Sequence, residues 1–297
     1  MQQGTLTAIF AETGTSPERL HRRLAAFNQR RFTPSLPNTH WVSDFAQQVS
    51  LSREEHRFLE ESRNAVAHRA SSAPTSANGF VAWFEDLRQN GPGQNDPLFT
   101  WLATAATLEQ MCWFLTQEVA GEAGFDDLVA ITQVRMACRP KLELARNYWD
   151  EMGRGNSKGM HGPMLNLLSM ALNLRPHPDT TVWQSLALAN TMAGLAANRQ
   201  YAFHSIGALG VVELTAPSRS ALIAEGLKRL GVSAGDRHYF DLHAILDVKH
   251  AAAWNREVIH PMVDDEPGLT SAIAEGALMR LNCGAGCFER YRREFRL

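Results

Sequence analysis

Helix-forming segments follow one another along the whole chain, and no segment alternates between apolar and polar residues as a β-strand does. Stretches rich in Ala, Leu, Glu, Arg and Met are separated by short breaks that carry Gly, Pro, Ser or Asn. There is no internal repeat. Amphipathic helices without a sheet can bury their apolar faces only against one another, so the sequence predicts an all-α helical bundle.

The N-terminal part predicts three helices joined by loops rich in Pro and Ser. Ser16 is a typical capping residue and Pro17 suits the first helical position, so a helix is expected to begin there. The expected helices span residues 16–31, 51–68 and 80–88.

Longer helices are expected after the loop rich in Gly and Pro at residues 90–97. Their ends are placed at glycines and at prolines such as Pro140 and Pro217, because proline breaks the hydrogen bonding of a helix interior. The expected ranges are 98–137, 141–152, 160–173, 180–215, 218–230, 236–258, 266–282 and 288–295.

A single domain is expected to span residues 1–297. Of these residues 44% are hydrophobic, which is enough for one large core. Residues 1–95 hold few clusters of bulky apolar side chains and would form a weak core by themselves. We therefore expect residues 1–95 to be a helical extension of a metal-binding bundle formed by residues 96–297.

Charge and hydropathy argue against several classes of partner. The formal net charge is −2 and the pI is near 6.6, which gives no reason to expect nucleic acid or an anionic membrane. No run approaches the roughly 20 apolar residues that a membrane span needs. The first twelve residues lack the basic start and apolar stretch of a signal peptide. We expect a cytoplasmic protein that acts on a small molecule, and the sequence leaves a homodimer open.

The four cysteines agree with a reducing compartment. Cys112 and Cys138 lie in apolar helical patterns and are expected to be small core residues. Cys283 and Cys287 form a C-x3-C motif that could be half a zinc site or a disulfide, but no second Cys/His pair of matching spacing lies beside it. The favoured interpretation is two thiols near a Gly-rich turn.

Three residues with metal-binding side chains share one face of the helix expected at residues 236–258. His243, Asp247 and His250 stand at i, i+4 and i+7, where a helix points side chains the same way. Their neighbours are apolar or small, and an amphipathic helix places core residues at these positions. Buried polar groups need partners, and imidazole with carboxylate suits non-haem iron. Taken alone, the triplet also fits a solvated helix face.

A second source of ligands lies upstream, where Glu213 is the lone charge in an apolar segment. A carboxylate there is strongly disfavoured in a core unless it has a partner, although it could also reach solvent near a helix end before Pro217. Gly207 and Gly210 precede it and would allow a close approach of a neighbouring helix or a ligand.

Glu151 and His161 flank a Gly-rich loop at residues 153–159, which can fold both side chains toward one point. In the helix before them, Glu118 and Glu122 stand at i and i+4 and face the same way, so spacing alone does not choose between them. In an antiparallel pair of helices Glu122 lies closer to the level of Glu151. Glu122 is therefore favoured, with Glu118 as a supporting group or an exposed charge.

This order of residues resembles the diiron oxidases and oxygenases with a haem-oxygenase-like fold, a family of iron-containing redox enzymes. Members have a Glu on the first core helix, Glu-x9-His or a shorter variant on the second, a lone Glu on the next, and then His-x3-Asp-x2-His. The matching residues span more than half of the chain: Glu122, Glu151, His161, Glu213, His243, Asp247 and His250.

The resemblance implies a fold of about seven core helices that binds two irons per chain rather than haem and activates O2. His161, His243 and His250 would be nitrogen ligands and the four carboxylates oxygen ligands, with Asn147, Tyr148 and Tyr239 as candidates to hold the imidazoles. Members oxidise small metabolites, and an amine or amino-acid-derived substrate is favoured, by N-oxygenation or oxidative C–C cleavage. Oxidative decarboxylation or desaturation of a fatty acid or amino acid is the alternative, and an external electron donor is possible.

Other helical proteins fit the sequence less well. A haem oxygenase would leave the acidic residues unexplained, and a thiamin-degrading enzyme of similar shape would need an activated cysteine. A ferritin-like bundle would show two Glu-x-x-His pairs, whereas only Glu18 and His21 have that spacing. A non-catalytic helical binding protein is the remaining alternative, and it predicts no bound metal.

Overall fold

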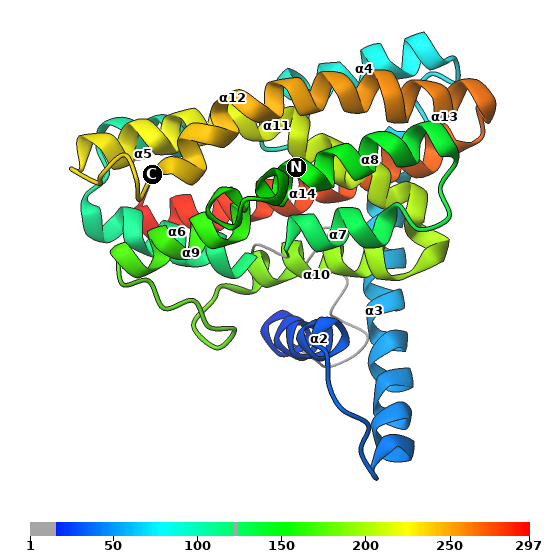
Figure 1. Ribbon diagram of the computed structural model, residues 1–297, viewed down its shortest axis with the longest axis horizontal. Coiled ribbons are helices and arrows are strands. Elements are labelled where there is room, and N and C mark those ends of the chain that lie inside the picture. The colour runs from blue at the N-terminus through cyan, green and yellow to red at the C-terminus, as the bar shows by residue number, and fades with distance from the viewer. Residues whose placement is uncertain (1–15, 122–123) are drawn as a thin grey trace.

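Helices build the part of the chain that the computed structural model describes, residues 16–121 and 124–297 (Figure 1). Within these ranges the only extended pairing is an isolated bridge between Met152 and Met160. The predicted all-α fold is confirmed.

The chain enters through three helices and continues into the bundle. The first elements are α2 (Pro17–Phe32), α3 (Trp41–Ala70), α4 (Ala77–Asn90), α5 (Pro97–Thr104), α6 (Leu108–Gly121), α7 (Phe125–Thr132) and α8 (Cys138–Glu151). The 3-10 turns η1 (Gly153–Gly155) and η2 (Ser157–Gly159) then lead to α9 (His161–Ala171), α10 (Trp183–Ala197), η3 (Arg199–Tyr201), α11 (Ala202–Arg229), α12 (His238–Trp254), the π-helical turn η4 (Asn255–Ile259), α13 (His260–Asp265) and α14 (Leu269–Phe295). None of the described helices is both long and apolar enough to cross a membrane.

Helix α11 holds the bundle together. It packs along α14 and α12 and also contacts α5 and α10 (Figure 1). One apolar cluster joins α11 to α3, α4, α10 and the α12–α14 region, and a second joins it to α5, α6, α9 and the end of α14. A polar side chain on the remaining face of α11 therefore lies between two apolar clusters.

Two glycines let α11 and α14 cross almost backbone to backbone. A Cβ on Gly207 would lie 1.9 Å from the carbonyl oxygen of Ile273, and a Cβ on Gly276 would lie 1.8 Å from that of His204. A Cβ on Gly210 would lie 2.5 Å from the indole nitrogen of Trp254 on α12. The close approach of neighbouring elements expected at Gly207 and Gly210 is thus present.

The N-terminal helices pack on the bundle. Helix α2 lies against α10, α3 against α14, and α4 against α11 and α13. The first half of α3 extends beyond the bundle in Figure 1 and exposes Trp41, Val42 and Phe45 to solvent. The division into an extension before residue 96 and a bundle after it stays a prediction.

The prediction of a single helix at residues 98–137 is wrong, because α5, α6 and α7 occupy this stretch. A reciprocal cap starts α6: the backbone N–H of Gln110 donates to the hydroxyl of Thr107, and the backbone N–H of Thr107 donates to the side-chain oxygen of Gln110. Gly124 then adopts a φ of +70° directly before α7.

The helix expected at residues 180–215 is also interrupted, and the stop expected at Pro217 is absent. Asn198 is extended between α10 and η3, and its side-chain amide donates to the carbonyl of Gly194 and to Glu55 on α3. Pro217 lies inside α11, which runs on to Arg229. The packing of α11 against its neighbours outweighs the one hydrogen bond that proline removes.

Three further expectations fail near prolines and glycines. Pro140 lies in the first turn of α8 rather than ending a helix, which is a position that proline tolerates. The Gly-rich turn expected at Cys283 and Cys287 is helical, because α14 is continuous from Leu269 to Phe295. Cys287 is fully buried, but Cys138 is exposed and is not the core residue that the sequence predicts.

We predict that Gly207→Ala lowers the free energy of unfolding by at least about 2 kcal/mol, because its methyl group forces α11 away from α14. Urea or guanidinium denaturation measures the effect. Gly268→Ala is the matched control, since Gly268 has an ordinary φ of −64° and a Cβ added there would meet no atom within 4 Å. Equal denaturation midpoints for the two variants would contradict the close crossing.

Candidate metal centre

Six of the residues expected to bind metal meet where α8, α9, α11 and α12 face one another. Five of them are buried and His243 is half-buried. They are Glu151 at the end of α8, His161 at the start of α9, Glu213 on α11, and His243, Asp247 and His250 on α12.

The loop between α8 and α9 brings Glu151 and His161 together, as the sequence predicts. It closes through the bridge between Met152 and Met160, the residues next to the two ligands. Gly153 has a φ of +61°, and a Cβ there would lie 2.4 Å from the backbone of Gly159. The loop can therefore close this tightly only because that position has no side chain.

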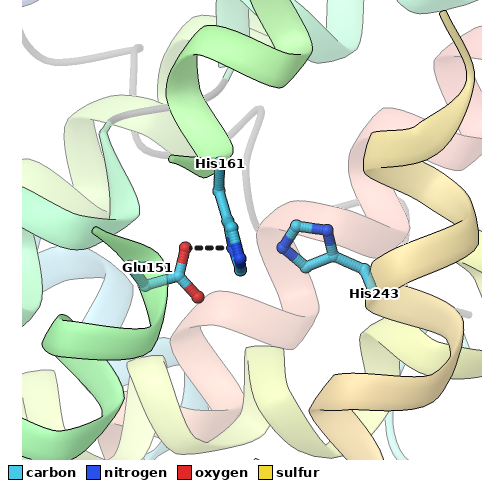
Figure 2. A group of neighbouring side chains, drawn as sticks. All are labelled: Glu151, His161 and His243. Carbon is cyan, nitrogen blue, oxygen red and sulfur yellow. Dashed lines mark ion pairs between the residues drawn. The ribbon is translucent and has the colours of Figure 1, made fainter. Parts of the chain in front are cut away.

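The first candidate group consists of Glu151, His161 and His243, each offering one ligand atom within 4.8 Å of the others (Figure 2). The Nδ1 atom of His161 lies 2.5 Å from Oε2 of Glu151, out of line for a hydrogen bond. The rings of His161 and His243 are 4.6 Å apart between centroids. Nδ1 of His243 donates to the carbonyl of Tyr239 at 2.7 Å, which leaves its Nε2 as the ligand atom.

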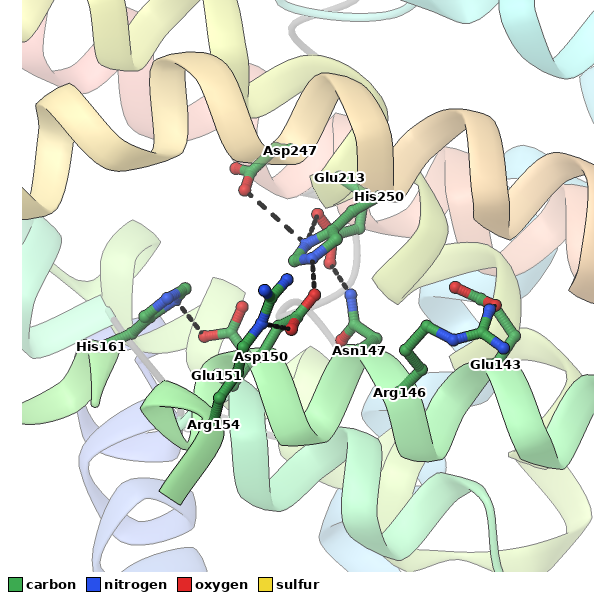
Figure 3. A network of polar contacts seen from close by, with 10 residues as sticks. All are labelled: Glu143, Arg146, Asn147, Asp150, Glu151, Arg154, His161, Glu213, Asp247 and His250. Carbon is green, nitrogen blue, oxygen red and sulfur yellow. Dashed lines mark hydrogen bonds and ion pairs between the residues drawn. The ribbon is translucent and has the colours of Figure 1, made fainter. Parts of the chain in front are cut away.

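The second candidate group consists of Glu151, Glu213 and His250 (Figure 3). Nδ1 of His250 lies 3.4 Å from Oε2 of Glu213. On the other side of the ring, Nε2 lies 3.1 Å from the carboxylate of Asp150. The carboxylate of Glu151 belongs to both groups, so the two candidate sites are adjacent and share one ligand.

Asp247 faces the second group without a hydrogen bond to its Oδ1 atom. That atom is 4.0 Å from Nδ1 of His250, and the residue is 2% exposed. Burial raises the pKa of Asp247 well above its usual range, and the negative charges of Glu213 and Glu151 add to the effect. A cation bound between these groups would remove the energetic cost of a negative charge on Asp247.

The three histidines fall into two protonation classes. Burial lowers the pKa of His161 and of His243 to about 4, so both rings are neutral at physiological pH. Burial alone would also lower the pKa of His250, but its contacts with the carboxylates of Glu213 and Asp150 raise it to about 9. In the metal-free protein His250 thus carries the positive charge that partly offsets the carboxylates.

The chemistry of the residues fits iron. Imidazole nitrogens and carboxylate oxygens are the donor set of non-haem iron. Nδ1 of His161, Nδ1 of His250 and Oδ1 of Asp247 are buried atoms without a hydrogen bond, which is costly unless another group completes them. Among the described residues, no lysine or arginine lies within 4 Å of Glu213 or Asp247.

Of the two carboxylates expected from the first core helix, the structure describes Glu118. Glu122 lies outside the described residues. Glu118 lines the same cavity as His161 and His243, but its carboxylate accepts a hydrogen bond from the hydroxyl of Tyr291 at 2.9 Å and belongs to neither group. Burial raises the pKa of Glu118.

Two supporting residues lie on α8, one turn apart. The side-chain amide of Asn147, a candidate from the sequence, donates to Oε1 of Glu213 at 2.6 Å (Figure 3). The sequence reasoning missed Asp150, which holds the ring of His250. Its spacing of i+3 from Asn147 was the available signal.

The two tyrosines expected to hold the imidazoles lie in different surroundings. Tyr239 packs its ring 4.2 Å from that of His243 but supports it through the backbone carbonyl, and Tyr148 packs against an apolar cluster. Two histidines outside the candidate centre have other partners: His204 pairs with Glu275, and His260 contacts Asn78.

A cavity of about 170 Å³ adjoins the two groups. Glu151, His161, Glu213, His243 and Asp247 form part of its wall. Much of the remaining wall is apolar, from Phe99, Leu165, Val212, Ile223 and Phe240. The candidate metal ligands therefore face a space that can admit a small molecule.

Comparison with solved structures supports the fold. Two crystal structures of a CADD-like protein of unknown function from Nostoc punctiforme superpose with TM-scores of 0.54 and 0.50, each at 16% sequence identity. The first match covers 73% of this chain and 95% of that protein, and the second covers 82% and 98%. No match is found among curated proteins.

The family model described as iron-containing redox enzyme matches residues 112–285. This segment is more than half of the 297 residues, and it contains all six residues that meet at the candidate centre. The chain therefore belongs to the family of iron-containing redox enzymes.

Proposed function

We propose that the protein is a non-haem diiron oxygenase or oxidase that uses O2 to oxidise a small metabolite. Membership of the family supports an iron-dependent redox function. The observation that carries the finer proposal is the pair of ligand groups that share Glu151 beside one cavity. The favoured reaction is N-oxygenation or oxidative C–C cleavage of an amine or amino-acid-derived substrate, with decarboxylation or desaturation as the alternative.

Bound iron would supply the electrons that reduce O2. The residues of the chain hold and orient the ligands. His161 and His243 are neutral at physiological pH and need to lose no proton before they bind a metal. Asp150 and Asn147 fix the ring of His250 and the carboxylate of Glu213, which keeps both pointed at the shared Glu151.

A non-catalytic binding protein explains these groups less well. Buried imidazole and carboxylate atoms without hydrogen bonds would destabilise a protein whose only task is to present a surface. A haem site is also disfavoured as a proposal, because the ring of His161 lies against the ring of His243 and the carboxylate of Glu151. Absence of a Soret band shift on addition of haem would agree with this.

We predict that anaerobic loading of the wild-type protein gives about two Fe(II) per chain and that O2 then produces a transient visible absorption. His243→Ala should remove the first ligand group and abolish the absorption, and Glu213→Gln should do the same through the second. Metal analysis and stopped-flow spectroscopy measure both effects.

His238→Ala is the matched control for this experiment. His238 is exposed on the same helix as His243, so its loss should change neither the iron content nor the absorption. Circular dichroism checks that each variant is folded. Less than one iron per chain in folded wild-type protein would refute the diiron proposal.

We predict that Asp150→Asn weakens Fe(II) binding by about 10- to 100-fold, because the ring of His250 loses the carboxylate that orients it. An anaerobic titration measures the affinity. Asp150 also pairs with Arg154, which is 70% exposed, so Arg154→Gln separates the two roles. If both variants bind iron alike, the contact with His250 has no role in the site.

We predict that Fe(II) affinity rises with pH between about 6.5 and about 9, by up to about tenfold per unit for one released proton. His250 keeps its proton up to a pKa of about 9 and must lose it to bind metal, whereas His161 and His243 titrate near 4 and do not contribute in this range. Burial also raises the pKa of Asp247, and any slope that it adds stays in a variant that lacks only His250. Titrations across the range measure the slope. His250→Gln should flatten it, and an unchanged slope in that variant would contradict the assignment.

A further inference from the structure

Beside the candidate metal ligands, the same cavity contains two arginines that the proposed function does not use. Arg219 lies on α11 and Arg280 on α14, and both line the cavity. They are half-buried. Two arginines on the wall of one small cavity can together bind an anion.

These two side chains form no ion pair with a carboxylate among the described residues. No carboxylate oxygen lies within 4 Å of either guanidinium there, and both arginines act on the nearby carboxylate of Glu118. Burial, together with the proximity of Arg280, lowers the pKa of Arg219 to about 9. Both arginines therefore keep N–H donors for an anion, although the carboxylates of the candidate centre line the same cavity.

Arg219 is held in place before any ligand arrives. Its guanidinium lies 5.5 Å from the ring centroid of Phe288 and 5.9 Å from that of Phe99, and it donates to the hydroxyl of Thr215. The Thr215 contact uses one of its five N–H groups. The remaining donors suit a planar acceptor with two oxygens.

The arginines and most of the candidate metal ligands line the same cavity. One face of α11 lines it continuously, through Val212, Glu213, Ala216, Arg219, Ser220 and Ile223. Arg219 lies six positions after Glu213, which is about 9 Å along a helix. Apolar side chains, among them Leu165, Ile223 and Phe240, also line this cavity.

We propose that Arg219 and Arg280 bind the carboxylate of the substrate, so the substrate is a carboxylic acid with an apolar or neutral body that extends toward Glu213. The identification of this acid as a substrate rests on the proposed function, but its binding does not need iron. A carboxylate would accept hydrogen bonds from the two guanidinium groups that lack an ion pair, and it would be repelled from the carboxylates at the candidate centre.

Octanoate and octanamide, used with metal-free full-length protein, test the proposal by calorimetry. The two probes share an apolar chain and differ in the charge of the head group. Wild-type protein should bind octanoate at least about tenfold more tightly than octanamide. Arg280→Gln should remove this preference, whereas Arg293→Gln, an exposed arginine on the same helix, should leave it unchanged.

Glu118→Gln provides a test with the opposite sign. Glutamine still accepts the hydrogen bond from Tyr291 but removes the negative charge beside the arginines. Octanoate should then bind more tightly than in wild-type protein, with octanamide unchanged. Equal binding of the two probes by wild-type protein, or an undiminished preference in folded Arg280→Gln, would overturn the proposal.

His243→Ala separates the two proposals. It should lose iron and keep the preference for octanoate, because His243 belongs to a metal group that includes neither arginine. A protein that prefers octanoate but binds no iron would refute the diiron function alone. A protein that binds two irons without that preference would refute the carboxylate site alone.

Discussion

The structure depends on the burial of carboxylates and imidazoles between four helices. Glu213 and Asp247 are each 2% exposed, and no cationic side chain of a lysine or arginine among the described residues lies within 4 Å of either. Such a cluster destabilises the metal-free fold, and only the protonated His250 and the amide of Asn147 offset part of the effect. The apolar clusters on both sides and the close packing of α11 against α14 offset this effect.

Most of the candidate site could be predicted from the residue types and their spacing in the sequence. His243, Asp247 and His250 share a face for geometric reasons that hold in any helix, and a lone Glu213 in an apolar segment is disfavoured unless a partner meets it. The role of Asp150 was not predicted, because its neighbour Glu151 has the same charge. Only the orientation of α8 determines that Asp150 contacts His250 while Glu151 contacts His161. The side of a helix that meets a partner is a tertiary property that composition does not contain.

The helix boundaries likewise depend partly on the local sequence and partly on contacts with distant residues. The cap at Thr107 and Gln110 is local and was readable as a T-x-x-Q pattern, although the apolar residues around it favoured one long helix. The break at Asn198 is not local, since it is stabilised by Glu55, which is 143 residues away. Pro217 illustrates the reverse case, in which contacts along α11 keep a helix intact through a residue that would end an isolated one.

The arrangement of charge in the cavity also bears on the kind of oxidation that the centre would perform. If Arg219 and Arg280 hold the carboxylate of the substrate, that group lies about two helical turns from Glu213 and is kept away from the metal ligands. Oxidative decarboxylation needs the carboxylate or its neighbouring carbon at the metal, whereas oxidation of a nitrogen or carbon farther along the substrate does not. The same positive charge that would bind an acid thus favours reaction at its opposite end.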